Sequence, residues 1–421
     1  MALRSVGIPA AFEFVPYWGS NNNGHSFVSI ILPDNKIYPL QNTDKQANGD
    51  YYLSRKTPKI YRKMYSIQDL AKHIDNIPEL FRHNDLLDVT KLHNIGSCDV
   101  TVSTNINKEK ENFLSVFSPK RWVPVAFSSS QTFHHIGTGN IYNVDRNKEA
   151  IDLGDGIVYL PTHWVNEEAI PIGSPIIVSE DSVREIKPDT KHLERVVCKR
   201  KFPLNMRIVD FSKLMIMGVF EGANKADFSD ATELYKITKT PESKMQKIEI
   251  SAEKAYRYIR YRKPKGTFSI AEFCLYQSDE KLLPFHPIAC DAIYEDSTML
   301  NIFDGQPLTY YQVSGGIDLW VGVDLYKPVK ISKIGFAPRN DDNAIVSTDT
   351  YELFYWQDQW ISLGRKRPIG DSVVYDNVPQ KALLWLRNLT KGREERPFTY
   401  ENGKQIWSVS YTHLTLPTNR E

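Results

Sequence analysis

The sequence predicts a mainly β chain that is divided into several β-sandwich domains, and three observations support this fold class. The chain has 421 residues, enough for two to four domains of ordinary size. Aromatic residues make up 12% of it, with 22 tyrosines and 8 tryptophans. Its 24 prolines and 22 glycines divide short alternating apolar runs. Such runs between turn residues are typical of sandwich strands rather than of helical bundles.

The start of the chain predicts a helix end followed by strands. Residues 4–9, with Gly7 in their middle, have the order of a helix that stops at glycine before a strand begins. We therefore expect the chain to begin inside a domain, without a signal peptide. Strand-like runs follow at 12–15, 25–32 and 37–40. The last two predict a hairpin around a turn at 33–36.

The rest of the chain predicts strands, apart from one helix. Apolar residues at helical spacing over 66–83 indicate a modest helix that connects domains. The basic cluster at 199–203 indicates a solvated linker. The predicted domains are 1–95, 98–200, 205–280 and 282–407, followed by a non-native, adapter-like tail at 408–421, which has no periodicity.

Charge and cysteine usage exclude several function classes. The 52 basic and 51 acidic side chains nearly cancel, so no basic excess predicts binding to nucleic acid or to an anionic membrane. No apolar run reaches the roughly 18 residues of a membrane-spanning helix. The four cysteines form no CxxC pair and are too few for a disulfide scaffold. We expect free, buried thiols, although Cys274 and Cys290 could pair.

The run LRSVGIP at 3–9, followed by Trp18-Gly19 and Asn23-Gly24-His25-Ser26, resembles the second half of a bacterial transglutaminase-like domain. In that family a cysteine on the preceding helix is the nucleophile, and the next strands carry a histidine base and then an acid. The resemblance implies that His25 is the base and that the cysteine would lie before residue 3. A histidine that merely caps a strand is the alternative.

The third member of that triad is less well defined. The resemblance places it at Gln41, whose side-chain carbonyl can orient an imidazole. Asp34 and Asp44 are weaker choices because they lie in predicted turns. The resemblance thus implies a partial α+β, cysteine-protease-like remnant at the N-terminus, inactive by itself.

The fourth predicted domain resembles a discoidin (coagulation factor 5/8 type C) or galactose-binding-like module, which is a jelly-roll sandwich. The resemblance is carried by IFDGQPLTYY at 302–311, by LWVGVDL at 319–325 and by a strand that ends before Arg339. Tyr310 or Tyr311 replaces the tryptophan of that family, and Tyr326 replaces its glycine. The resemblance also implies a structural Ca²⁺ at Asp304 and Thr309, with a plain Asp-Gly turn as the alternative.

Ring-bearing and polar residues of this module predict sugar binding, because C–H faces stack on rings and hydroxyls need polar partners. The candidate ligand-binding residues are Tyr310, Tyr311, Trp320 and Arg339. Adjacent residues of a strand face opposite ways, so only one of the two tyrosines can join the core if the strand has begun there. The alternative is that both tyrosines pack the end of the sandwich. In the third predicted domain, Glu272 and a strand with tyrosines at 256, 258 and 261 match other parts of the same family, and we interpret that strand as one-sided.

Two functions of different classes follow. The first is a fragment of a secreted transglutaminase-like cysteine hydrolase or acyl transferase that acts on a glycan, glycoprotein or peptide. The second is a non-catalytic carbohydrate-binding or structural protein. Both imply a secreted, periplasmic or cell-surface location, no nucleic acid partner, no integral membrane segment, and no cofactor besides the structural Ca²⁺.

Overall fold

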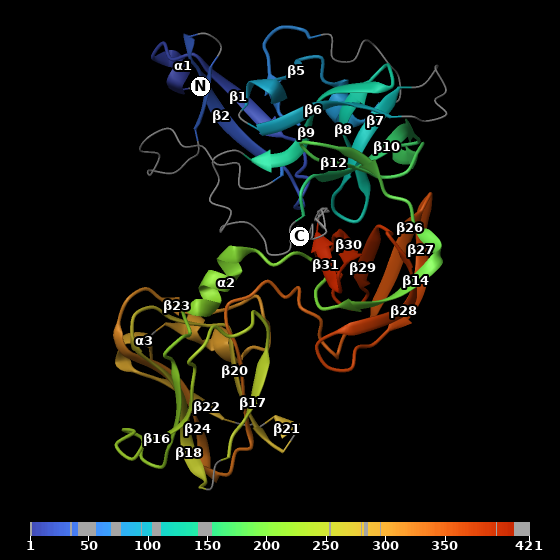
Figure 1. Cartoon of the computed structure of the whole chain (residues 1–421). Coiled ribbons are helices and arrows are strands. Elements are labelled where there is room, and N and C mark those ends of the chain that lie inside the picture. Colours follow the sequence, from blue (N-terminus) through green and yellow to red (C-terminus); the bar gives the residue numbers. More distant parts are fainter. Residues whose placement is uncertain are drawn as a thin grey trace, which may run out of the picture. The chain divides into compact units, whose positions relative to one another are not determined.

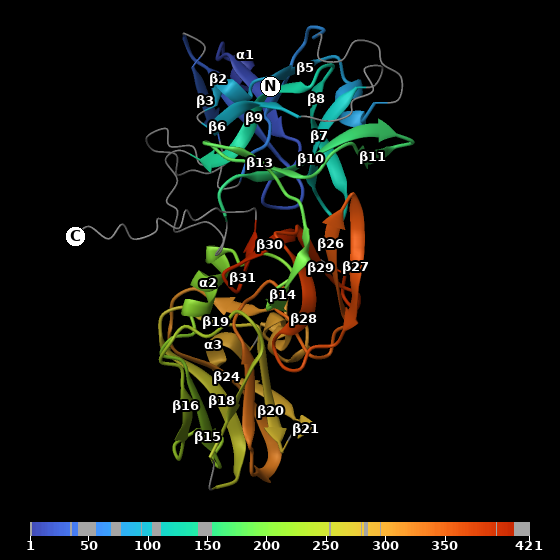
Figure 2. The same ribbon diagram turned by 45° about the vertical axis from the view of Figure 1, so that its right-hand side comes forward.

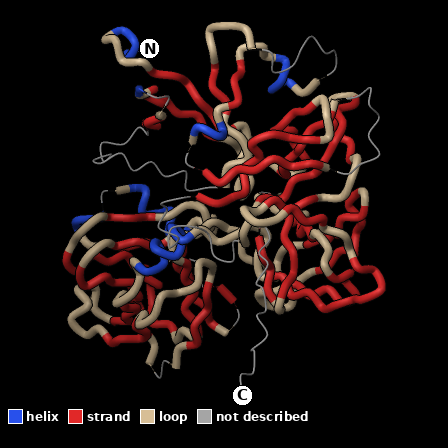
Figure 3. The backbone as a smooth tube through the Cα atoms, turned by 45° about the horizontal axis from the view of Figure 1, so that its top comes forward, coloured by secondary structure: helices blue, strands red, loops and turns tan. Residues whose placement is uncertain are grey.

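The protein is mainly β, as the sequence predicts. The computed structural model describes residues 2–33, 36–40, 56–68, 77–93, 95–102, 111–141, 154–251, 254–278, 280–281, 285–294, 296–392 and 394–407 (Figure 1). Within these ranges strands dominate, as the tube in Figure 3 shows, and the strand pairs are antiparallel. None of the helices in these ranges combines the length and the apolarity that a membrane crossing requires.

The chain forms two compact units. The first consists of Met1–Pro203 together with Ile345–Glu421, and the second is Leu204–Ala344. The chain therefore leaves the first unit near the predicted linker at 199–203 and returns to it about 140 residues later. The linker is less solvated than its charges suggest, because Lys201 is fully buried and donates to the carbonyl of Glu394 at 3.2 Å.

The second unit is a sandwich of two sheets around one core (Figure 2). One sheet has the order β16 (Thr232–Lys236), β15 (Val219–Ala223), β18 (Tyr256–Lys265), β24 (Ile317–Val329) and β22 (His286–Ala289). The other has the order β17 (Gln246–Glu249), β25 (Lys333–Ala337), β20 (Glu272–Gln277) and β21 (Glu280–Lys281). Phe220 and Val321 of the first sheet and Phe273 of the second belong to the same buried cluster.

Shorter elements complete this unit. They are α2 (Met206–Lys213), β19 (Phe268–Ile270), α3 (Asp291–Tyr294), the 3-10 helix η5 (Ser297–Phe303) and β23 (Tyr311–Val313). Strands β19 and β23 pair with each other. The side chain of Asn205 accepts a hydrogen bond from the backbone N–H of Arg207 at 2.8 Å, which caps the first turn of α2.

These pairings differ from the predicted division into modules at 205–280 and 282–407. Strand β18 pairs with β24, and β20 pairs with β25, so both sheets join residues from the two predicted modules. Residues 345–407 belong to the first unit instead. The expected boundary lies inside a single sandwich, because strands far apart in the sequence form backbone hydrogen bonds with one another in the same sheets.

The tyrosine-rich strand β18 also differs from its prediction as a one-sided strand. Its pairing with β24 shifts register between Tyr256 and Tyr258. A bulge of this kind moves the following side chains to the opposite face. Tyr256 and Tyr261 therefore both lie in the main core, whereas Tyr258 packs with Phe228 in a separate cluster.

The first unit begins as the sequence predicts. Helix α1 (Ala2–Ser5) ends before Gly7, whose φ is +81°, and β1 (Ala10–Val15) follows. The predicted hairpin consists of β2 (His25–Ile31) and β3 (Ile37–Leu40). The sheet order is β3, β2, β1, β4 (Tyr61–Lys63) and β5 (Leu86–Asp88). The described part of the predicted helix at 66–83 holds only the 3-10 helix η2 (Glu79–Arg82), and 69–76 lie outside the described residues.

A second group of strands in this unit is joined closely to the first sheet. It contains β6 (Ile95–Thr101), β7 (Asn112–Phe117), β8 (Trp122–Ser128), β9 (Thr132–Ile141), β10 (Ile157–Val165), β11 (Glu168–Pro171), β12 (Ile176–Val178) and β13 (Val183–Glu185), after the 3-10 helix η3 (Thr90–Leu92). The buried side chain of Lys56 donates to the carbonyls of Gly154 and Gly156. Tyr61 of β4 donates to the carbonyl of Val125 at 2.8 Å. These contacts bridge the predicted boundary between 95 and 98.

The last strands of the chain complete the first unit. Strands β26 (Tyr351–Gln357), β27 (Gln359–Lys366), β29 (Leu384–Asn388), β30 (Pro397–Glu401) and β31 (Lys404–Trp407) form one sheet, and β14 (Asp189–Cys198) pairs with β28 (Val373–Gln380). The predicted aromatic hairpin is β26–β27. Its Trp356 packs edge-on against Trp122 of β8, with ring centroids 5.5 Å apart. The tail at 408–421 lies outside the described residues.

Truncation tests this division. We expect a protein of residues 204–344 to fold by itself, and one of residues 282–407 to be sensitive to protease, because it would lack β18 and β20 beside β24 and β25. Limited proteolysis and the dispersion of NMR amide signals would measure both. A folded, protease-resistant 282–407 fragment would contradict the unit boundaries.

Candidate functional site

His25 lies at the start of β2, opposite Val15 of β1, and its side chain is exposed. Its ring stacks on Trp18, with centroids 5.9 Å apart, and on Phe27, with centroids 5.8 Å apart. Two stacked neighbours hold the imidazole in one orientation at the surface. The other predicted triad residues, Asp34, Gln41 and Asp44, lie outside the described residues.

A cleft of about 670 Å³ opens beside His25. Its lining includes the rings of Phe12 and Phe14, whose centroids are 6.1 Å apart, and Trp164. Charged side chains also line it, namely Lys63, Glu79, Arg82, Asp85, Arg121 and Glu167. Among the described residues that line the cleft there is no cysteine. All four cysteines are free thiols: Cys198 and Cys274 are buried, and Cys98 and Cys290 are half-buried.

Behind His25, a buried polar cluster centres on Glu13 of β1, which sequence reasoning missed. The ring of His93 meets Phe27 edge-on at 5.7 Å, and its Nε2 lies 2.8 Å from a carboxylate oxygen of Glu13. Ser29 donates to the same carboxylate at 2.5 Å, and Arg62 donates to it at 2.8 Å. Burial by itself would raise the pKa of Glu13, but the contacts with His93, Ser29 and Arg62 outweigh it and lower the pKa. The cluster therefore fixes the carboxylate in its charged form.

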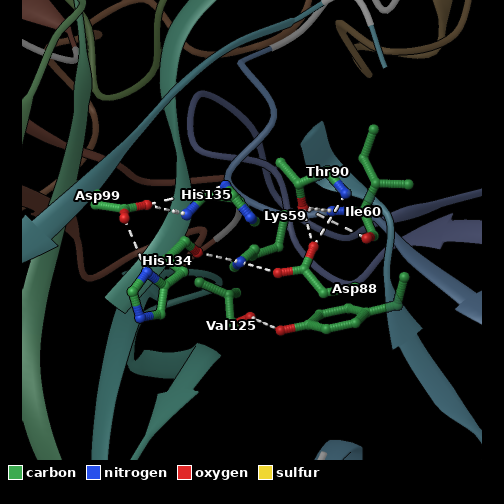
Figure 4. A network of polar contacts seen from close by, with 9 residues as sticks. Lys59, Ile60, Asp88, Thr90, Asp99, Val125, His134 and His135 are labelled. Carbon is green, nitrogen blue, oxygen red and sulfur yellow. Dashed lines mark hydrogen bonds and ion pairs between the residues drawn. The ribbon is translucent and has the colours of Figure 1, made fainter. Parts of the chain in front are cut away.

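A second polar network in the first unit joins β5, β9 and the segment before β4 (Figure 4). Lys59 donates to the carboxylate of Asp88 and, at 2.6 Å, to the carbonyl of His134. Asp88 also accepts from the hydroxyl of Thr90 at 2.6 Å. At the surface end, Asp99 accepts from the backbone of His135 at 3.0 Å and lies 2.8 Å from Nδ1 of His134. Each charged side chain of this network has a hydrogen-bond partner within it. We therefore interpret the network as one that holds these strands together rather than as a binding site.

In the second unit, the predicted metal residues Asp304 and Thr309 do meet. The hydroxyl of Thr309 lies 3.0 and 2.9 Å from the two carboxylate oxygens of Asp304 and 2.8 Å from the carbonyl oxygen of Gln306. The turn between them begins with Gly305, whose φ of +74° favours glycine. This arrangement by itself is a closed turn with an exposed carboxylate.

Glu272 of β20 adds a second carboxylate to this turn. It is 2% exposed, and its Oε1 has no hydrogen-bond partner among the described residues. Burial and then the charge of Asp304 raise the pKa of Glu272 to about 7. A hard cation would bind such oxygens and remove the repulsion between the two carboxylates. Within the described ranges no group of three His, Cys, Asp or Glu side chains is placed to hold a metal ion, so hydroxyl and carbonyl oxygens would complete the ligand set.

The two adjacent tyrosines separate as predicted. Tyr311 is 4% exposed and belongs to the main core, whereas Tyr310 is half-buried outside it. The guanidinium carbon of Arg339 lies 3.9 Å from the centroid of the Tyr310 ring and 3.8 Å from that of Phe211 of α2. The structure thus brings two of the predicted ligand-binding residues together and adds Phe211, which no sequence motif indicated.

Trp320, the remaining predicted ligand-binding residue, belongs to a different cluster. Its ring centroid is 5.2 Å from that of Phe228, and both rings lie beside the guanidinium of Arg260. The arginines of β18 are paired there: Arg260 and Arg262 with Glu221, and Arg257 with Asp324. These pairs, with that of Arg262 and Asp318, offset the charge of the three arginines, while Lys263 and Lys265 leave the strand basic.

Comparisons of the chain with protein-family models, with curated proteins and with solved structures found no match.

Proposed function

We propose that Leu204–Ala344 is a carbohydrate-binding module of the discoidin or galactose-binding type, exported with the rest of the protein. The observation that carries this proposal is the half-buried ring of Tyr310 held against Arg339 beside the turn of Asp304 and Thr309. A sugar needs an apolar ring face and adjacent polar groups, and this cluster supplies both. Tyr311 packs in the core at the start of β23, and Tyr310, the residue before that strand, is half-buried outside the core.

Removal of the Tyr310 ring tests the proposal. We expect the wild type to bind a galactoside with a Kd in the millimolar to high micromolar range. One ring contact contributes on the order of 1 kcal/mol, so Tyr310→Ala should raise that Kd about fivefold. Titration followed by NMR on the full chain measures the change, after a glycan array has selected the sugar.

A matched control comes from Tyr326, which is 56% exposed on β24 and has a φ of +64°. The family that this module resembles has glycine at that position, and Tyr326→Gly removes an exposed ring at a position where glycine is favoured. Binding should stay unchanged in this variant. Equal affinities of wild type and Tyr310→Ala, or the absence of binding to any glycan, would contradict the proposal.

We propose as a second function that His25 is the base of a transglutaminase-like cysteine hydrolase or acyl transferase. What favours it is the placement of an oriented, exposed imidazole at the edge of the 670 Å³ cleft. A general base of this kind contributes about 10²–10⁴-fold to a rate. A thiol brought to the imidazole would become the nucleophile.

In a protein that carries a cysteine-bearing helix of that family before residue 3, turnover of peptide-amide and glutamine substrates should fall by at least about a hundredfold in His25→Ala. His134→Ala is the matched control, because His134 is also exposed but belongs to the network around Asp99. Liberated ammonia or incorporated amine measures the rate. Unchanged turnover in His25→Ala of that protein would contradict the proposal. The present chain has no cysteine among the described residues that line the cleft, and it should show no turnover.

A further inference from the structure

We propose that the Tyr310 site selects an anionic sugar, whose carboxylate or sulfate group binds the guanidinium of Arg339. This inference rests on the proposed carbohydrate-binding function and adds the chemical class of the ligand.

The first step is the rigidity of Arg339. Two rings from separate elements contact its guanidinium, Phe211 at 3.8 Å and Tyr310 at 3.9 Å. Contacts of this kind attract the cation to the ring faces and hold its plane. The N–H groups at the edge of that plane are left for hydrogen bonding. The side chain is therefore ordered before any ligand arrives, which lowers the entropy cost of binding.

The second step is the absence of a partner for those N–H groups. In the part of the chain that the structure describes, the guanidinium of Arg339 makes no hydrogen bond and no ion pair, although the residue is half-buried. The arginines of β18 differ, since Arg257 pairs with Asp324, and Arg260 and Arg262 pair with Glu221. A guanidinium has five donors in a fork that fits two oxygens of a carboxylate or sulfate.

The third step concerns the surrounding charges. Arg207 of α2 lies against the same Phe211 ring, with its guanidinium carbon 5.6 Å from the centroid, and adds a second positive charge. Asp341, the nearest carboxylate along the chain, accepts from the backbone of Asn343 at 3.2 Å. Asp304 accepts from the hydroxyl of Thr309 at 2.9 Å and keeps its charge, but in the described part of the chain it forms no ion pair with Arg339. The rings and two cations thus form a site with a sugar-stacking face and a preference for negative charge.

The test compares sugars that differ only in charge. Methyl galactoside, methyl galacturonide and methyl galactoside 6-sulfate are titrated against the full chain at low and high salt. We expect the galacturonide or the sulfate to bind about ten- to a hundredfold tighter than the neutral sugar, with the preference reduced by salt. A preference for galacturonide identifies a carboxylate as the ligand group, and a preference for the sulfate identifies a sulfate.

Two variants of Arg339 locate the effect. Arg339→Gln should abolish the preference, and Arg339→Lys should lose most of it, because an ammonium keeps the charge but lacks the fork. Arg367→Gln, which removes an exposed arginine of the first unit, should change nothing. A preference that survives Arg339→Gln overturns the inference.

The remaining outcomes separate the inference from the function on which it rests. Equal binding of the three sugars, still weakened by Tyr310→Ala, overturns the anionic preference and leaves the carbohydrate-binding function intact. Failure of all three sugars and of every glycan on the array overturns both.

Discussion

Calcium is expected to raise the melting temperature of the Leu204–Ala344 unit at pH 8 and to leave it nearly unchanged at pH 5. Glu272 is buried, and one of its carboxylate oxygens has no hydrogen-bond partner among the described residues; burial together with Asp304 raises its pKa to about 7. At pH 5 the carboxyl is protonated and is a poor metal ligand. At pH 8 the carboxyl is charged, which costs free energy because it is buried close to the charge of Asp304. A cation that binds both carboxylates and Thr309 removes that cost.

The same shift predicts how stability depends on pH without calcium. A carboxyl with a raised folded pKa binds its proton more tightly in the folded state, so stability is highest below the unfolded pKa of 4.5 and falls as pH rises toward about 7. The loss is about 3 kcal/mol. Calcium at a hundred times its Kd would restore about 2.7 kcal/mol.

Calorimetry at both pH values, with calcium or with chelator, measures these effects. Glu272→Gln should remove both the pH dependence and the response to calcium. Glu249→Gln is the matched control, because Glu249 is an exposed carboxylate of the same unit that pairs with Lys333 at 3.1 Å. A calcium-induced shift of equal size in wild type and Glu272→Gln would exclude a cation at this turn.

Replacement of Glu13 by leucine is expected to destabilise the first unit by about 3–5 kcal/mol at pH 7, because it leaves Arg62 buried without its carboxylate and removes the partner of His93. Contacts with these residues and Ser29 lower the pKa of Glu13 despite burial. Its contribution is therefore present above the unfolded pKa of 4.5 and lost as pH falls through the lower folded pKa.

Urea unfolding followed by tryptophan fluorescence measures the change, and the difference between wild type and variant should shrink in acid. Glu185→Leu is the control in the same unit, because its ion pair with Lys187 is exposed and should contribute less than about 1 kcal/mol. Glu13→Gln provides a second variant with preserved shape. If both Glu13 variants unfolded at the same urea concentration as the control, the buried cluster would contribute no net stability.

Local features of the fold follow from the sequence. The glycine stop at Gly7, the β2–β3 hairpin and the burial of Val321, Val323 and Leu325 depend on turn chemistry and two-residue alternation, which neighbouring residues determine. Tyr311 begins β23 in the core, whereas Tyr310 lies before that strand and is half-buried, so alternation alone does not account for their separation.

Long-range pairing could not be predicted in this way. Glu272 and Asp304 were expected in different modules, so no reasoning along the chain placed their carboxylates together, although the family resemblance includes segments around both. Phe211 reaches Arg339 from a helix 128 positions earlier in the chain, and no periodicity encodes that contact. The register shift in β18 likewise arises from its pairing with β24, which alternation within β18 does not reveal.

The pairing of β14 with β28 has a consequence for biosynthesis. Strand β14 emerges from the ribosome before the whole Leu204–Ala344 unit, and its partner emerges after it. At synthesis rates of about 5–20 residues per second, β14 waits on the order of 10–35 s for that partner. The inserted unit has all its strands within its own span and can fold during this interval. Chaperones that cover an unpaired edge should therefore act on the nascent chain between these two strands.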